Sequence, residues 1–214
     1  MFDYIINVSG YILEGSIVTF QLYLLTALFS VIVGIIGALG KISKIPFLES
    51  ILSFYTWVFR GTPLLLQLFF AYYGLPVLGI TLQPFPAAVL TFIVNYGAYF
   101  TEIFRGGIES IEEGQYEAAQ VLGMNYRQTM SRIILPQTVK RVLPATSNEA
   151  INLVKDSALV AVIGLGDLLR SAKVAVTRDF SIVPFIIAAV FYLIISSVIV
   201  TVFRKLEEKY SVYE

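Results

Sequence analysis

Apolar residues gather along the chain in five long runs that are separated by shorter polar stretches. A membrane-spanning α-helix needs about 20 predominantly apolar residues, and each run meets that length. The predicted spans cover residues 15–39, 48–75, 86–107, 140–163 and 182–203, and the fourth is the most polar. The pattern predicts an all-α integral membrane protein of about five transmembrane helices, forming a single transmembrane domain over residues 1–214.

One polar, charged segment, residues 110–137, lies between the third and fourth predicted spans. It predicts two short helices. Gly123 is placed to end the first as a C-cap glycine, Asn125 to begin the second as an N-cap, and Pro136 to close it. Several apolar residues of this segment would be exposed. They fit either a connector that lies on its own bundle or on the lipid surface, or a docking element for a groove on a cytoplasmic partner.

Basic residues lie unevenly about the predicted spans. Ten of them fall on one side: Lys41, Lys44, Arg105, Arg127, Arg132, Lys140, Arg141, Arg204, Lys205 and Lys209. Three fall on the other: Arg170, Lys173 and Arg178. Cytoplasmic loops carry an excess of Lys and Arg. We therefore expect the N-terminus outside, and the C-terminus and the 110–137 segment in the cytoplasm.

Composition supports the membrane location and excludes several functions. Hydrophobic residues make up 57% and charged residues 14% of the chain, against about 25% charged residues in soluble domains. The basic and acidic residues number 15 each, so the net charge favours no nucleic-acid partner. Without cysteine or histidine, the chain has no thiolate or imidazole metal ligand and no Ser-His triad.

The chain also lacks the G-x-x-x-x-G-K-[ST] loop that cradles nucleotide phosphates. We therefore expect a non-enzymatic protein with no catalytic residues, metal or cofactor of its own. If it acts in ATP-driven transport, ATP and Mg²⁺ must bind to another chain.

Arg60 lies within the second predicted span, where a charge costs roughly 2.5–3.5 kcal/mol on insertion scales. Thr62 and Pro63 follow it, and Pro63 removes a backbone donor and weakens the helix. Broken helices hold polar ligands in many transporters. Arg60 either pairs with an acidic residue to hold helices together or binds a substrate carboxylate through its planar guanidinium.

The fourth predicted span carries a polar stripe. Glu149, Asn152 and Asp156 are three and four residues apart, which places them on one side of a helix. Such a stripe lines either a water-filled path or a dimer seam. Two acids and an amide exceed what helix association usually requires, so we favour the path. Ser157 adds a hydroxyl next to the stripe.

The third predicted span offers Asn95 and Glu102. Asn95 is placed for substrate contact or for an interhelical hydrogen bond. Glu102 can pair with Arg105 three residues later, which favours a structural or gating role, with substrate contact as the lesser alternative. The predicted substrate-binding residues are Arg60, Thr62, Asn95, Glu102, Glu149, Asn152, Asp156 and Ser157.

The polar segment carries a further pattern: Glu117-Ala118-Ala119, then Gly123, then Ile134-x-Pro136. This pattern resembles the EAA loop of permease subunits of bacterial ABC importers. The stretches "RGTPLLLQLFF", "EIFRGGIESI", "GQYEAAQVLG" and "KDSALVAVIGLGDLL" are similar to the polar amino-acid branch of that family, which includes histidine, arginine and glutamine permeases. The resemblance extends over nearly the whole chain.

The resemblance implies a type I ABC importer permease fold in a bacterial inner membrane. It also implies four kinds of partner: a second permease subunit, identical or not; two ABC ATPase subunits; an extracytoplasmic amino-acid-binding protein; and an amino-acid substrate. The ATPase subunits would bind the EAA loop through Glu117, Ala118, Ala119, Gly123 and Pro136.

The acidic excess among the candidate residues favours a zwitterion with a cationic side chain: arginine, lysine or histidine. Arg60 would then face its α-carboxylate. The alternatives are a permease for glutamine- or glutamate-type substrates and, less favoured, a self-sufficient secondary transporter. Residues 164–181 hold all three outside basic residues and predict a short surface helix with a loop. They serve either as a landing surface for the binding protein or as a plain connector.

Overall fold

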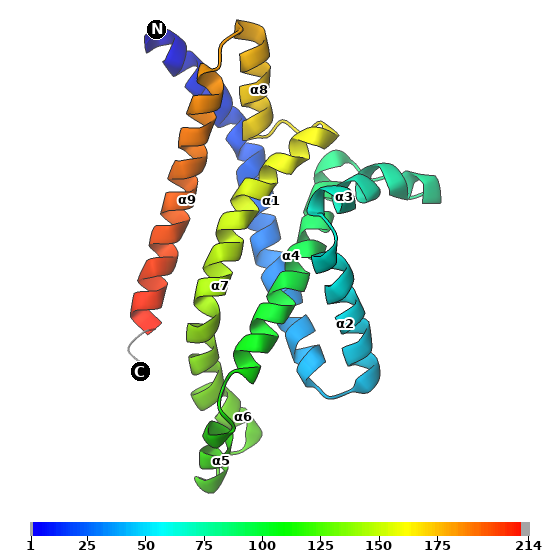
Figure 1. The fold of residues 1–214 in the computed structure, drawn as a ribbon, viewed down its shortest axis with the longest axis vertical. Helices are drawn as coiled ribbons and strands as arrows, with labels where there is room; N and C mark the ends of the chain where they lie inside the picture. The colour runs from blue at the N-terminus through cyan, green and yellow to red at the C-terminus, as the bar shows by residue number, and fades with distance from the viewer. Residues whose placement is uncertain (1, 211–214) are drawn as a thin grey trace.

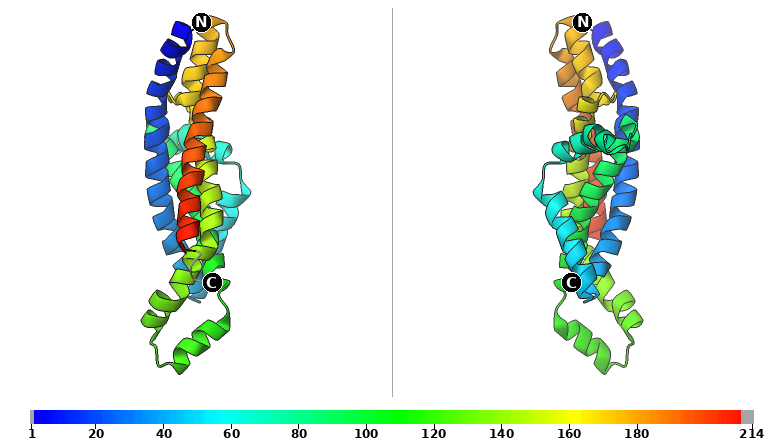
Figure 2. Two further views of the ribbon diagram at one scale, coloured as in Figure 1. Left: turned by 90° about the vertical axis from the view of Figure 1, so that its left-hand side faces the viewer. Right: turned by 90° about the vertical axis from the view of Figure 1, so that its right-hand side faces the viewer.

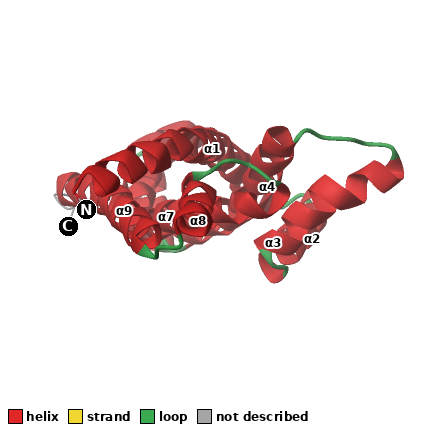
Figure 3. Cartoon of the chain, turned by 90° about the horizontal axis from the view of Figure 1, so that it is seen from above, coloured by secondary structure: helices red, strands yellow, loops and turns green. Residues whose placement is uncertain are grey.

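The computed structural model describes residues 2–210; residues 1 and 211–214 of the predicted domain lie outside the described residues. Its elements in chain order are α1 (Phe2–Ile42), α2 (Pro46–Gly61), α3 (Leu64–Phe69), η1 (Phe70–Gly74), η2 (Leu75–Leu78), α4 (Pro84–Glu109), α5 (Glu113–Val121), α6 (Tyr126–Thr129), η3 (Met130–Ile134), α7 (Leu135–Asp156), η4 (Ser157–Ile163), α8 (Leu168–Asp179) and α9 (Val183–Tyr210). Over residues 2–210 there are only helices and loops (Figure 3), which confirms the all-α prediction.

Four long helices, α1, α4, α7 and α9, run side by side along the long axis (Figure 1). Among the described residues, α1, α4 and α9 are long and apolar enough to cross a membrane. The bent pair formed by α2 and residues 64–78 counts as a fourth crossing if it is one span. The remaining predicted span is α7, whose polar stripe makes it too hydrophilic to qualify by composition. It lies in the bundle beside α4 and α9.

The first helix is longer than the pattern predicted, because α1 has 41 residues and begins at Phe2. At 1.5 Å per residue this is roughly 60 Å, about twice the hydrocarbon thickness of a bilayer. Its first turns pack on α8 and α9 through a cluster that includes Ile12, Leu168 and Ala188. Tertiary packing thus extends the helix beyond the stretch that lipid alone requires.

The second predicted span, 48–75, is not one helix. It breaks after Gly61, where the direction of the helix bends by 103°. Pro63 stands at the N-cap of α3 in an extended conformation, as expected for a residue without a backbone N–H. The second half leaves the bundle sideways, as Figure 1 shows. The predicted weakening of the helix at Pro63 is confirmed.

Helices α1 and α4 form the most extensive interface in the bundle. A Cβ atom at Gly34 would lie 2.4 Å from Cβ of Phe100, and one at Gly37 would lie 2.3 Å from Oγ1 of Thr101. Small residues let two membrane helices approach closely and gain packing contacts. This interface supports the buried cluster around Leu22, which also holds side chains from α3, α7 and η4.

The Gly37→Val variant is expected to lower the free energy of unfolding by about 1–3 kcal/mol, because the added methyl groups overpack the α1–α4 interface. Thermal unfolding of the purified protein measures the change. The matched control is Gly10→Ala in the same helix, where no heavy atom lies within 4 Å of the new Cβ. The control is expected to be neutral or slightly stabilising. Equal melting temperatures for both variants would contradict the close packing.

Candidate functional site

A cavity of about 610 Å³ lies at the break between α2 and α3, facing α4 and α7. The break supplies one wall, a turn of α4 supplies the second, and the polar stripe of α7 supplies the third. Its lining residues are Arg60, Gly61, Thr62, Pro63, Leu64, Leu65, Asn95, Tyr96, Tyr99, Glu149, Asn152, Asp156 and Leu159. Three segments far apart in the sequence therefore bring polar side chains to one place.

Six of the eight predicted substrate-binding residues line this cavity: Arg60, Thr62, Asn95, Glu149, Asn152 and Asp156. The three stripe residues of α7 share a helical face, as their spacing predicted. The break in the second span places Arg60 and Thr62 at the cavity edge. The structure thus joins three groups of candidates that the sequence pattern alone leaves unconnected.

Glu102 does not line the cavity, which corrects its assignment to the substrate site. Its carboxylate lies 2.6 Å from Lys41 Nζ and 2.6 Å from Arg105 Nη2, and it accepts a 2.9 Å hydrogen bond from Thr56 Oγ1. These groups come from α1, α2 and α4, so Glu102 holds three helices together. The predicted pairing with Arg105 is confirmed.

Ser157 is also absent from the cavity. It is completely buried, and its hydroxyl donates a 2.6 Å hydrogen bond to the backbone carbonyl of Val154. The helix tightens to 3₁₀ geometry at this residue, which turns the side chain away from the stripe. Its place next to Asp156 in the sequence gave no information about this turn.

Two cavity residues that sequence reasoning did not select are Tyr96 and Tyr99 of α4. The hydroxyl of Tyr96 donates a 2.7 Å hydrogen bond to Oδ2 of Asp156. The guanidinium carbon of Arg60 lies 5.4 Å from the centre of the Tyr99 ring, within the range of a cation–π interaction. The sequence feature that could have identified them is their position about one helical turn from Asn95.

The charges of the cavity are unequal, because two carboxylates, Glu149 and Asp156, stand against one guanidinium, Arg60. Within residues 2–210, neither Arg60 nor Lys155 comes within 4.0 Å of either carboxylate to form an ion pair. Direct ion pairs with Arg60 or Lys155 therefore do not neutralise these two carboxylates. The cavity is acidic and rich in hydrogen-bond acceptors.

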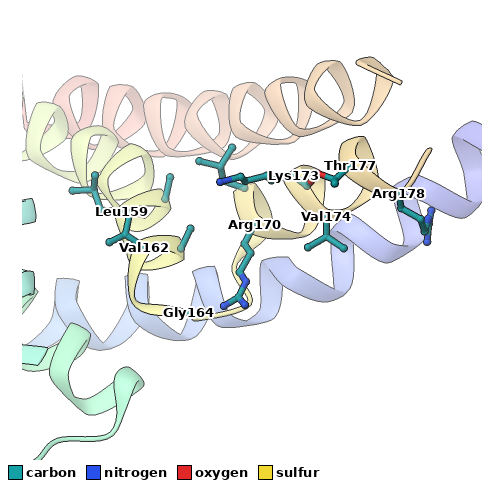
Figure 4. A pocket seen from close by; sticks show the side chains of 11 residues that line it. Leu159, Val162, Gly164, Arg170, Lys173, Val174, Thr177 and Arg178 are labelled. Carbon is teal, nitrogen blue, oxygen red and sulfur yellow. The ribbon is translucent and has the colours of Figure 1, made fainter. Parts of the chain in front are cut away.

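A larger cavity of about 920 Å³ lies between η4 and α8 (Figure 4) and shares only Leu159 with the first. It is lined mostly by apolar residues, together with Arg170, Lys173 and Arg178. The predicted short helix in the 164–181 stretch is confirmed as α8. Arg178 pairs with Asp179 at 2.6 Å, and this hydrogen-bonded pairing lowers the pKa of the Asp179 carboxyl.

The 110–137 segment projects beyond the bundle at the end opposite the N-terminus (Figure 2). Its first helix, α5, ends as predicted. Gly123 has a left-handed φ of +71°, its N–H donates to the carbonyl of Gln120, and the N–H of Met124 donates to that of Ala119. These two bonds form a Schellman motif. Leu122 remains 77% exposed in this segment.

The second helix of the segment begins at the predicted residue. The Asn125 side chain accepts from the backbone N–H of Gln128, whose side chain accepts from the backbone N–H of Asn125, which is a capping box. Pro136 does not close this helix, so that prediction is wrong. It stands in the first turn of α7, where its missing N–H costs little because the chain passes through a π-helical turn just before it.

Three of the five residues predicted to couple to a partner lie in α5, and they differ in solvent exposure. Glu117 and Ala118 are exposed, whereas Ala119 is buried against the rest of the segment. Val121 and Leu122 are exposed at its C-terminal end. The segment therefore offers a small, partly apolar surface at the tip of the molecule.

Residues 30–212 match the family described as binding-protein-dependent transport system inner membrane components. The chain belongs to this family. It is a permease, a multi-pass protein of the inner membrane, and its fold is the type I ABC importer permease fold that the sequence predicted.

Two relatives and one solved structure resemble this permease along nearly its full length. The arginine transport system permease protein ArtQ of Bacillus subtilis (strain 168) is 43% identical over 202 residues, covering 93% of this chain and 92% of that protein. A permease protein of Rickettsia bellii (strain RML369-C), named provisionally for glutamine transport, is 37% identical over 214 residues, covering 98% of each. The crystal structure of an amino acid ABC transporter with histidines has a TM-score of 0.89 at 36% identity and covers 98% of each chain.

Proposed function

We propose that the permease is the translocation subunit of an ATP-driven importer for amino acids with cationic side chains. The amino-acid class is supported by relatives named for arginine and glutamine transport and by the match to an amino acid ABC transporter. The cationic preference is carried by one observation: Glu149 and Asp156 face a cavity with a single guanidinium, Arg60.

The roles within the cavity follow from this charge distribution. Arg60 binds the α-carboxylate of the substrate, since a planar guanidinium matches a carboxylate. Glu149, which interacts electrostatically with Arg60, binds the α-ammonium group, and Asp156 binds the side-chain cation. Thr62 and Asn152 supply uncharged hydrogen-bonding groups at the edge.

A second candidate is a substrate of the glutamine type, which the name of the Rickettsia relative favours. Its side-chain amide would donate to the carboxylates without carrying charge. The two candidate substrates can therefore be distinguished by asking whether recognition depends on the negative charges of Glu149 and Asp156.

Energy comes from other chains in this proposal. Two ABC ATPase subunits bind ATP and Mg²⁺ and contact the projecting segment at the exposed Glu117 and Ala118. Ala119, Gly123 and Pro136 take part in the coupling by maintaining the shape of the segment. The exposed apolar tip of α5 supports this role. A second permease subunit and an extracytoplasmic binding protein complete the transporter.

The proposed orientation has the N-terminus outside and the projecting segment in the cytoplasm. Two observations support it: the excess of basic residues on the cytoplasmic side, and the position of the first turn of α1 and the last turn of α9 toward opposite ends of the bundle (Figure 1).

The Asp156→Asn variant tests the cationic preference. L-Arginine and L-citrulline have nearly the same shape, but only arginine has a charged side chain. Uptake of both is measured in proteoliposomes that contain the permease, its ATPase and its binding protein. The variant is expected to lower kcat/KM for arginine by about 10-fold or more, because a hydrogen bond to a charged group contributes about 1.5–3 kcal/mol.

Asparagine keeps the shape of the side chain, and its Oδ1 can still accept from Tyr96, so the fold is preserved. Citrulline uptake is expected to change little. The matched control is Glu49→Gln, which removes an exposed acid outside the cavity. An equal loss for both substrates would refute the cationic preference, and uptake without ATP would refute the importer itself.

A further inference from the structure

The break between α2 and α3 leaves backbone carbonyls without their helical donors. In an unbroken helix the carbonyl of Phe59 would accept from the N–H of the residue four positions later, but that residue is Pro63, which has none. A side chain replaces the missing donor. Nε2 of Gln67 donates to the carbonyl of Phe59 at 3.0 Å and to that of Thr62 at 3.1 Å.

The orientation of the Gln67 amide is fixed by these partners. A carbonyl oxygen can only accept, so the NH₂ group of Gln67 must face the two carbonyls. Oγ1 of Thr62 lies 2.8 Å from Nε2 and shares one of the two Nε2 hydrogens with a carbonyl, because the Thr62 hydroxyl donates its own hydrogen to the carbonyl of Val58. The Oε1 atom of Gln67 is therefore directed toward α4.

Asn95 of α4 donates a hydrogen bond to this oriented acceptor. Its Nδ2 donates to Oε1 of Gln67 at 3.0 Å and to the carbonyl of Phe59 at 2.8 Å. Both partners are acceptors, so both hydrogens of the Asn95 amide are committed to the broken span. Its Oδ1 accepts no hydrogen bond within residues 2–210, and Asn95 lines the acidic cavity.

We propose that Gln67 is a positioning residue that orients the Asn95 amide so that only its oxygen is available to substrate. Asn95 then adds a third acceptor to the carboxylates of Glu149 and Asp156. The cavity would select substrate groups that donate hydrogen bonds, such as ammonium or guanidinium, and would disfavour groups that need a donor. This inference rests on the proposed function and adds a determinant that does not itself line the cavity.

The Gln67→Met variant tests the proposal in the purified permease–ATPase complex. Methionine has a similar size but cannot donate to the carbonyls or accept from Asn95. The Phe59 carbonyl is then the one acceptor left to the Asn95 amide, so one of its two N–H hydrogens is freed and can be offered to the cavity. Equilibrium binding of radiolabelled L-arginine is measured in competition with L-citrulline. The dissociation constant for arginine is expected to rise by about 10-fold, as for loss of a hydrogen bond to a charged group, and the preference for arginine over citrulline is expected to fall.

Two further variants separate orientation from simple stability. Gln67→Glu keeps the side-chain size and still offers the Asn95 amide an acceptor, so it is expected to keep the preference for arginine although its carboxylate cannot donate to the carbonyls. In an Asn95→Ala background, Gln67→Met is expected to have no additional effect on arginine binding, because its influence passes through Asn95. Gln21→Met makes the same chemical change on an exposed face of α1 and is expected to leave binding unchanged.

Each alternative outcome has a distinct meaning. If the wild-type complex does not bind arginine, or does not prefer it to citrulline, the proposed function fails. If the wild type prefers arginine and Gln67→Met keeps that preference, or if Gln67→Glu loses it as fully as Gln67→Met, the positioning role is overturned while the proposed function stands. A loss of thermal stability with an unchanged preference, or a full effect in the Asn95→Ala background, would also overturn it.

Discussion

Replacing Gly123 with valine is expected to weaken ATPase binding about 100-fold and to abolish ATP-driven uptake. The left-handed φ of +71° costs a residue with a Cβ atom about 1–2 kcal/mol, and more for a β-branched one. The two hydrogen bonds of the Schellman motif contribute about 1 kcal/mol each. A loss of about 3 kcal/mol corresponds to roughly a 100-fold change.

The location of Gly123 makes this loss local. The segment projects from the bundle (Figure 2), so few tertiary contacts can hold its shape once the cap is lost. The membrane helices should therefore fold normally while the docking surface is disordered. Co-purification of the ATPase subunit and uptake in proteoliposomes measure the two effects.

Gly114→Ala is the matched control for this variant. Gly114 lies in α5, the helix that Gly123 ends; its φ is not left-handed, and no heavy atom lies within 4 Å of an added Cβ. The control is expected to keep ATPase binding and uptake. Normal uptake by the Gly123→Val variant would show that this segment does not transmit the work of the ATPase.

The Glu102→Gln variant is expected to destabilise the permease by about 3–5 kcal/mol, as for loss of one partner in a buried ion pair. The side chains of Lys41 and Glu102 are only 11% and 13% exposed, so the variant leaves an ammonium group largely buried without its counter-charge. In thermal unfolding this corresponds to a fall of the melting temperature by about 10 °C.

Glu109→Gln serves as the control, because Glu109 also pairs with Arg105 but is 51% exposed. An exposed pair contributes less than about 1 kcal/mol. Adding Lys41→Met to Glu102→Gln is expected to restore part of the lost stability by removing the unpaired charge. Arginine affinity should remain that of the wild type. If the dissociation constant for arginine rises while the thermal stability is unchanged, Glu102 acts in substrate binding and not as a structural ion pair.

The candidate site was largely predictable because its strongest signals are local. The α7 stripe follows from the helical repeat, and the break after Gly61 follows from a proline that cannot donate. Each needs only residues within a few positions of one another. The same reasoning misplaced Ser157, since a change from α to 3₁₀ geometry within one turn depends on what packs around it.

Glu102 and Tyr96 show where local reasoning ends. Glu102 and Asp156 are both intramembrane carboxylates. The sequence gives no sign that Lys41 lies 2.6 Å from Glu102, or that the Tyr96 hydroxyl donates to Asp156. Both pairings join residues about 60 positions apart. They exist only because α1, α4 and α7 pack together.

The sequence by itself determined the apolar helices, the interruption at Pro63, the helix end at Gly123 and the polar face of α7, because backbone geometry and side-chain periodicity act over one or two turns. Only the tertiary structure decided that the interruption and the polar face meet at one cavity. It also decided that Glu102 lies outside that cavity and that Gln67 orients Asn95. These are contacts between distant segments, and they depend on the positions and angles at which packed helices meet.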